Sequence, residues 1–260
     1  MKELRGWPEV ERAAPGDSRI AWAAQERPDG ELGPGVRAWR QGSAVVVASP
    51  DLSGRDRLAV TGEVGDTTPL VRGVLDEVGP SYRIFGPSEL VDGLVERIPG
   101  LGLLGELYWM EAHRTPRGRE RRTGSRPEVV WLDTAAEKAA EGLFDHHFPR
   151  SYAQPGRRGV KRWAGILDDT DGSGSERPVA VAAEAWSSST CGFMAGVVTH
   201  PEMRGKGLSQ AVCAFLLDAL VSRHGRAALM VHRHNAPAVG TYRALGMTGQ
   251  ALRATSLVQA

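Results

Sequence analysis

Apolar residues along this chain follow two spacings, which predict two kinds of element. Short apolar runs bounded by Gly, Pro, Asp or Ser are typical of strands. Stretches with apolar residues three and four positions apart predict helices at 69–78, 87–98, 134–144, 208–224 and 235–246. The predicted strands are 36–40, 44–48, 58–61, 82–85, 107–110, 129–132, 162–167, 178–185, 191–199, 227–231 and 252–258. Residues 1–35 predict a partly ordered lead-in or a first strand and helix. Strands that alternate with helices indicate an α/β fold.

Two helix boundaries follow from local chemistry. Thr68 is a capping residue and Pro69 suits the first helical position, so the helix of 69–78 is expected to begin there. Asn235 is expected to cap the last helix, with Gly246 at its end.

One segment, 113–127, interrupts this alternation. It combines Pro, Gly, Ser and clustered arginines without apolar periodicity, which predicts a linker. The predicted division is a first domain at 1–112, a basic linker at 113–127 and a second domain at 128–260. The basic run lacks interleaved aromatic residues, so a solvated connector is favoured over contact with RNA or an acidic partner.

Charge and composition narrow the functional classes. The 260 residues hold 32 basic and 31 acidic side chains, a net charge of +1, so no overall field favours nucleic acid or an anionic membrane. No apolar run approaches the roughly 20 residues that cross a bilayer, and the N-terminal segment lacks a signal-peptide apolar core. Cys191 and Cys213 lie in apolar patterns typical of reduced core thiols. A cytoplasmic location without a membrane or nucleic-acid partner is expected.

The stretch from Ala195 to Ser209 carries the first chemical signal. A buried strand ends in a glycine turn that leads directly into a helix. Gly205 and Gly207 allow main-chain N–H groups to converge on one phosphate, and Arg204 and Lys206 add positive charge at the helix N-terminus. The simpler interpretation is a tight connection. The turn matches neither a P-loop nor a dinucleotide motif, because Gly207 follows Lys206 and Gln210 stands where a third glycine belongs.

Two sequence motifs that follow one another along the chain relate this turn to a protein family. Arg204, Gly207 and Ser209 follow the pattern R-x-x-G-x-S. Asn235, Ala238, Tyr242, Gly246 and Met247 then follow the pattern N-x-x-A-x-x-x-Y-x-x-x-G-M. Together they resemble the GNAT superfamily of acyl-CoA-dependent N-acyltransferases over about the last 130 residues. Ser209 replaces the usual Gly or Ala and Met247 the usual Phe, exchanges that such positions tolerate.

The resemblance implies a GNAT fold, a mixed and mostly antiparallel sheet flanked by helices, and acetyl-CoA as cosubstrate without a metal. It implies a pantetheine that pairs with the strand end and a pyrophosphate on the turn amides. The implied cosubstrate-binding residues are Val198, Thr199, Arg204, Gly205, Lys206, Gly207, Leu208, Ser209, Asn235 and Tyr242. Residues 1–112 lack both motifs, but their order of elements is similar to the later part of this fold. A degenerate second copy that binds no CoA is therefore expected, with Pro50 and Asp51 standing after 44–48 in place of a glycine turn.

The resemblance also makes Tyr242 a general acid for the departing thiolate. By itself this tyrosine is more simply a core aromatic residue, and the motif spacing favours the catalytic interpretation. The general base stays open among Glu184 on the preceding strand, a water chain, and the side chains of Asp145, His146, His147 and His234. His232 and His234 have a spacing that a metal could use, but no third ligand is evident, so no metal is expected.

The sequence thus predicts an N-acetyltransferase that moves the acetyl group of acetyl-CoA to a primary amine by direct attack in a ternary complex. The acceptor is a small-molecule or peptide amine, and a homodimer is left open. The alternative from another class is a non-catalytic acyl-CoA sensor or scaffold.

Overall fold

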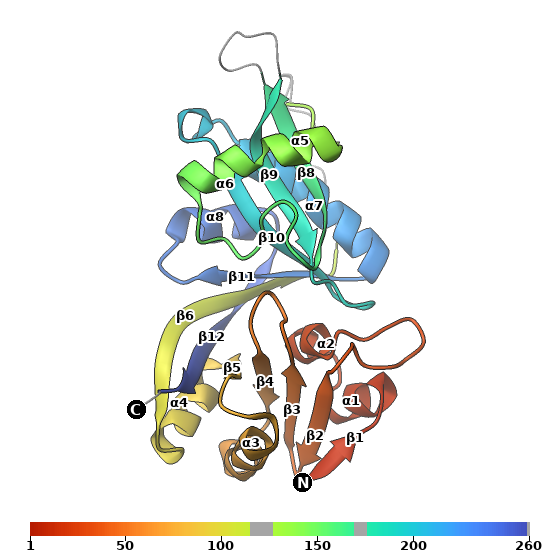
Figure 1. Ribbon diagram of the computed structural model, residues 1–260, viewed down its shortest axis with the longest axis vertical. Coiled ribbons are helices and arrows are strands. Elements are labelled where there is room, and N and C mark those ends of the chain that lie inside the picture. The colour runs from red at the N-terminus through yellow and green to blue at the C-terminus, as the bar shows by residue number, and fades with distance from the viewer. Residues whose placement is uncertain (115–126, 169–175, 259–260) are drawn as a thin grey trace.

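A computed structural model describes residues 1–114, 127–168 and 176–258 and places their strands in one twelve-stranded sheet (Figure 1). The order is β1-β2-β3-β4-β5-β12-β6-β11-β10-β9-β8-β7. The strands are β1 (Lys2–Leu4), β2 (Arg37–Gln41), β3 (Ala44–Ser49), β4 (Arg57–Thr61), β5 (Arg83–Pro87), β6 (Leu101–Ala112), β7 (Val130–Trp131), β8 (Val160–Asp168), β9 (Arg177–Ala185), β10 (Gly192–Thr199), β11 (Ala227–His232) and β12 (Thr248–Leu257). The predicted mixed, mostly antiparallel sheet is confirmed, since among the described strands only β4–β5 and β10–β11 pair in parallel.

The sheet is symmetric about its central pair, β12 and β6. Outward from β12 run β5, β4, β3 and β2, and outward from β6 run β11, β10, β9 and β8. The last strand of each half therefore pairs with a strand of the other half: β12 lies next to β5, and β6 lies next to β11. The two strands pair antiparallel from Thr248 opposite Glu111 to Leu257 opposite Leu101. The predicted division at 112 and 128 stays a prediction, but the sheet runs without interruption across it.

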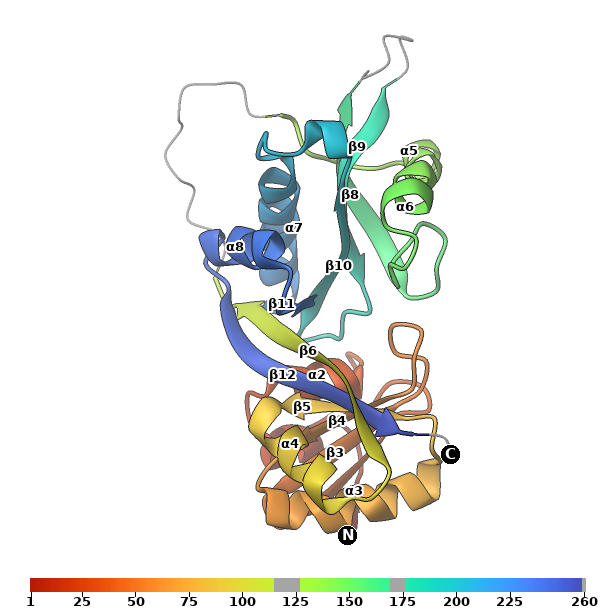
Figure 2. The same cartoon turned by 90° about the vertical axis from the view of Figure 1, so that its left-hand side faces the viewer.

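The helices cover both faces of the sheet (Figure 2). They are α1 (Trp7–Ala13), α2 (Ser18–Ala24), α3 (Val64–Val78), α4 (Ser88–Arg97), α5 (Thr134–Ala139), α6 (Glu141–His147), α7 (Leu208–His224) and α8 (Ala236–Ala244). In the C-terminal half α7 and α8 pack on one face, and α5 and α6 on the other. No helix in the described ranges is long and apolar enough to cross a membrane.

The beginning of α3 differs from the prediction. Pro69 lies inside the helix, which begins at Val64 with Glu63 as its N-cap. Pro69 has no N–H to donate to the carbonyl one turn earlier. The hydroxyl groups of Thr67 and Thr68 donate to the carbonyls of Glu63 and Val64 at 2.8 and 2.7 Å, which adds hydrogen bonds to the turn before the proline but does not replace the N–H that the carbonyl of Gly65 would otherwise accept.

The N-terminal counterpart of the glycine turn also lies elsewhere than predicted. Counting outward from the central pair, β4 corresponds to β10, so the equivalent connection is Gly62-Glu63 and not the segment after β3. Its helix starts with Glu63 at the N-cap and Asp66 in the first turn, where acidic groups oppose an anion. The expectation that this half binds no CoA therefore depends on the acidic residues at the start of α3 and not on the segment after β3.

Aromatic residues join the two halves on the α2 face of the sheet. Trp22 of α2 stacks on Phe193 of β10 with ring centroids 4.5 Å apart. Trp22 also meets Phe85 of β5 edge-on at 5.9 Å, and Trp109 of β6 lies 5.7 Å from Phe193. Both halves therefore contribute to one core.

The shared strands predict that the halves cannot be separated. A chain beginning at Pro127 would leave β11 without β6 and β12 without either neighbour, and would expose the face of Phe193. We expect the full chain to unfold in one cooperative thermal transition and the shortened chain to show none, as measured by circular dichroism. A shortened chain with its own sharp transition would contradict this arrangement.

Candidate active site

The candidate site begins where β10 leaves β11. These parallel strands pair only at Gly192 and Phe193, opposite Ala227 and Ala228, and then diverge. Beyond that point β10 pairs with β9 alone, through a bulge in which Gly196 and Val197 face the single residue Ala182. A bulge turns a main-chain N–H out of the ladder, where it can donate to a ligand. The divergence therefore opens strand edge along which a chain-like molecule can lie.

Gly196 is the residue that makes the bulge. Its φ is +62°, a left-handed conformation that favours glycine. A Cβ there would lie 2.6 Å from the ring of Trp163 and 3.1 Å from the carbonyl oxygen of Ala153. The loop that carries Ala153 therefore packs directly over the bulge.

The turn after β10 has the geometry of an anion site. Gly205 and Gly207 have φ values of +78° and +79°, and Gly207 is the N-cap of α7 without a side-chain cap or an acidic residue in the first turn. The main-chain N–H groups from Gly205 to Ser209 have no acceptor among the described residues. Exposed Arg204 and Lys206 lie beside them, and Arg204 Nε donates to the carbonyl of Thr199 at 3.3 Å. These groups suit a pyrophosphate.

The strand end beside this turn holds polar atoms in need of partners. Thr199 Oγ1 and His200 Nδ1 are both buried without a hydrogen bond in the described part of the chain. The ring of His147, at the end of α6, lies 5.1 Å from that of His200. The sequence predicted His147 only as a candidate base and did not predict His200, although the position of His200 directly after the strand was an available signal. Both rings lie at the level of the turn and so beside the phosphate site.

Tyr242 and Asn235 occupy their predicted places on α8. Tyr242 is buried beside Cys213 of α7, and its hydroxyl has no hydrogen bond within the described ranges. Burial raises the pKa of Tyr242, so the phenol keeps its proton at neutral pH. Asn235 caps α8, with its side-chain oxygen accepting from the N–H of Ala238 at 3.3 Å. The cap is confirmed, while contacts of either residue with CoA stay predictions.

Glu184 does not have the setting of a general base. Its fully buried carboxylate accepts from Arg162 Nε at 2.9 Å, and Lys161 Nζ and His224 Nε2 lie 3.7 and 3.3 Å away. Burial alone raises the pKa of Glu184, but His224, Arg162 and Lys161 outweigh it and hold the pKa at about 2. Glu184 faces Met194, two residues along β9 from Ala182 at the bulge, so its ion pairs and not its distance argue against this role. This geometry favours a structural role.

The other candidate bases are spread over the C-terminal half. Asp145 and His146 lie exposed on α6, and His146 Nδ1 is 2.9 Å from the carbonyl of Gly142. His232 and His234 stack with their ring centroids 5.1 Å apart at the exposed end of β11. Among the described residues, no group of three His, Cys, Asp or Glu side chains could hold a metal ion.

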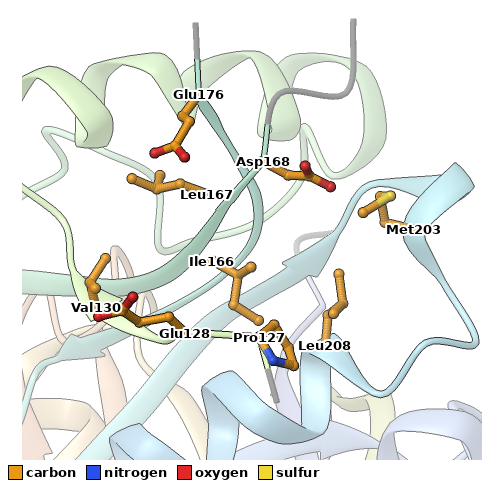
Figure 3. Close-up of a pocket in the computed structure, with 9 residues that line it drawn as sticks. All are labelled: Pro127, Glu128, Val130, Ile166, Leu167, Asp168, Glu176, Met203 and Leu208. Atoms are coloured by element: carbon orange, nitrogen blue, oxygen red, sulfur yellow. The ribbon is translucent and has the colours of Figure 1, made fainter. Parts of the chain in front are cut away.

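A pocket of about 460 Å³ adjoins the turn (Figure 3). In Figure 3 Met203 and Leu208 lie on one side and Ile166 of β8 lies between Leu208 and Val130, while the carboxylates of Asp168 and Glu176 stand in the upper part of the view. These acids, with Glu128, would repel phosphate groups. The turn amides therefore suit a phosphate group better than this pocket does.

The family comparison covers the same part of the chain. Residues 130–247 match the model of the Acetyltransferase (GNAT) family. No significant match is found among curated protein sequences. The matched segment is thus similar to the GNAT family, as its motifs predict, and this similarity supports acyl transfer from acyl-CoA; the family typically uses acetyl-CoA.

Solved structures resemble the whole chain. A GCN5-related N-acetyltransferase from Kribbella flavida superposes with a TM-score of 0.58 at 17% identity, covering 95% of this chain and 98% of that one. A GCN5-related N-acetyltransferase-like protein from Streptococcus suis gives a TM-score of 0.56 at 14% identity, with 97% and 100% covered. At these identities the likeness establishes the fold, and it extends over both halves.

The buried ion pairs of Glu184 predict a pH-dependent stability. Because folding lowers its pKa from 4.5 to about 2, the charged carboxylate stabilises the folded state above pH 4.5, and this contribution is lost as the pH falls toward 2. We expect Glu184→Gln to lower the free energy of unfolding by about 3 kcal/mol at pH 7, a difference that shrinks below pH 4.5. Urea unfolding of both proteins at each pH measures this difference in the free energy of unfolding.

Glu106→Gln is the control, since Glu106 makes ion pairs with Arg233 and Arg253 at the exposed surface. It should change stability by less than about 1 kcal/mol. A Glu184→Gln protein that keeps full stability while kcat collapses would instead favour the general-base role.

Proposed function

We propose that this protein is an N-acetyltransferase that moves an acetyl group from acetyl-CoA to a primary amine in a ternary complex. The observation that carries the proposal is the N-terminus of α7, where the N–H groups from Gly205 to Ser209 have no acceptor in the described part of the chain and adjoin the divergence of β10 from β11. A pyrophosphate on these amides would direct the pantetheine along Val198 and Thr199 toward the bulge. Asn235, at the start of α8, would contact the pantetheine.

In this proposal the thioester lies near the bulge of β10. An N–H freed from the ladder there donates to the carbonyl oxygen, which gains negative charge as the amine attacks. The tetrahedral intermediate then expels the thiolate of CoA, to which Tyr242 donates its proton. Its buried, protonated phenol suits that role. Water takes a proton from the ammonium group of the acceptor before the neutral amine attacks, since Glu184 is held in ion pairs and the His147 and His200 rings lie at the phosphate end.

The two halves have different roles in this proposal. Residues 128–260 bind the cosubstrate, and residues 1–112, a degenerate copy, shape the acceptor site from the α2 face. The mirrored order of strands about β12 and β6 supports such a duplication. A small-molecule or peptide acceptor, a cytoplasmic setting and an oligomeric state that includes the homodimer belong to the same proposal.

The test is release of CoA thiol from acetyl-CoA across a panel of primary amines, with acetyl-CoA affinity measured in parallel by calorimetry. Turnover on at least one amine supports the transferase. Tight binding without turnover of any amine would favour the alternative, a non-catalytic acyl-CoA sensor or scaffold.

Gly207→Glu should weaken CoA binding. The substitution places a carboxylate at the N-cap, where the amides would bind pyrophosphate, and we expect the Kd for CoA to rise about 100-fold. Gly225→Glu is the matched control, because Gly225 ends the same helix with a φ of +76° and, like Gly207, has no atom within 4 Å of an added Cβ. Calorimetry should find CoA affinity retained in the control. Equal loss in both variants would show that the effect is helix strain.

Tyr242→Phe should separate catalysis from packing. The ring stays in the core and the hydroxyl has no hydrogen bond to lose in the described residues, so the melting temperature and the KM for acetyl-CoA should hold. We expect kcat to fall by about 10- to 1000-fold. Tyr108→Phe, on β6, is the control. An unchanged kcat under conditions where chemistry limits turnover would exclude Tyr242 as the acid.

A further inference from the structure

A cluster of arginines meets an aromatic ring where the two halves approach each other. The guanidinium groups of Arg55 and Arg57, from the loop after β3 and the start of β4, lie 5.4 and 6.0 Å from the ring centroid of Tyr152. Arg83 is aligned with Arg57 on the neighbouring strand β5. Tyr152 belongs to the loop between α6 and β8, and Figures 1 and 2 show this loop facing the β3–β4 loop. We call these four residues the arginine cluster.

Among the described residues, the arginine cluster has no acidic partner. In the described part of the chain, no carboxylate lies within ion-pair distance of Arg55, Arg57 or Arg83. The neighbouring acids are engaged elsewhere: Asp51 pairs with Arg158 at 3.2 Å, and Asp56 accepts from the N–H of Asp51 at 3.0 Å. Three cations that converge without a counterion favour binding of an anion.

The electrostatics of the cluster also favour binding of an anion. Burial lowers the pKa of Arg57 to about 10, with a further contribution from the positive charges of Arg83 and Arg55. Burial alone would raise the pKa of Tyr152, but Arg55, Arg57 and Arg83 together bring it below its usual value. The site thus stabilises negative charge. Arg57 is held in place from behind, where its guanidinium donates to the carbonyl of Leu52 and to Ser53 Oγ at 3.1 and 2.9 Å.

The cluster adjoins the reactive end of the proposed active site. Ala153, next to Tyr152 in the chain, has its carbonyl oxygen 3.1 Å from where a Cβ of Gly196 would lie, at the bulge of β10. Arg57 also lies 6.0 Å from the ring of Trp22, which stacks on Phe193 at the point where β10 leaves β11. Arg55 and Tyr152 are exposed, so solvent and solutes reach the cluster.

We propose that the arginine cluster binds an anionic group of the acceptor, so that the substrate is a primary amine that also carries a carboxylate or a phosphate. The inference rests on the proposed function, because it takes the bulge of β10 as the place of the thioester. Arg55 and Arg83 donate to the anion, Arg57 supplies charge behind them, and the amine of the bound molecule extends toward the bulge. The N-terminal half then selects the acceptor.

The experiment compares amines that differ only in charge. Linear ω-amino acids of increasing length are assayed with acetyl-CoA beside their primary amides, and ω-aminoalkyl phosphates are included to distinguish the two anions. We expect at least one acid or phosphate to be preferred over its amide by about 10-fold or more in kcat/KM. Arg55→Gln and Arg83→Gln should each raise the KM for the preferred acid or phosphate about 10-fold without changing its kcat. The kcat/KM for the corresponding amide should stay the same. Arg12→Gln, an exposed arginine on α1, is the control.

A second measurement does not depend on turnover. Citrate is titrated by calorimetry into protein with CoA present, and we expect binding in the wild type and in Arg12→Gln but not in the Arg55→Gln/Arg83→Gln double variant. Two results would contradict anion binding by the arginine cluster without contradicting the transferase function. One is turnover of amides as efficient as that of acids. The other is citrate binding that is absent in the wild type or unchanged in the double variant. Citrate binding by the cluster with no turnover of any amine would overturn the proposed function alone.

Discussion

The antiparallel pairing of β6 with β12 is the interaction on which the rest of this structure depends. Each strand follows the last helix of its own half, yet each pairs with a strand of the other half, β6 with β11 and β12 with β5. Because main-chain groups inside a sheet need partners, neither half has a complete sheet alone. The aromatic contact of Trp22 with Phe193 follows from this arrangement, since the central pair brings α2 over the start of β10.

The candidate site uses the place where this pairing ends. At Phe193 the parallel pair β10–β11 opens, the bulge at Gly196 turns main-chain groups out of the ladder, and the turn after Thr199 presents N–H groups at the start of α7. Divergence, bulge and helix terminus thus lie in line along one strand. The same strand contacts the N-terminal half at one end and the proposed phosphate site at the other, which places an acceptor between them in the proposed function.

Local chemistry made much of this predictable. The boundaries of α7 and α8, the glycine turn and the Asn235 cap follow from residues close together in the chain, and the predicted strands recur with small shifts. The failures also have local causes. The helix of α3 begins before Pro69 and continues past it, and in β6 the apolar pattern predicted only 107–110 because residues 102–106 are partly or fully exposed.

The sequence by itself determined the fold class, the motif residues and the resemblance to the GNAT family that they carry, because backbone conformation at glycines and helix caps is set by neighbours a few positions away. Only the tertiary structure decided that β12 lies in the centre of the sheet, that Glu184 is bound by Arg162, Lys161 and His224, and that Arg57 lies against Tyr152. Those contacts join residues far apart in the chain. Such partners depend on strand order and packing, which no short window of sequence records.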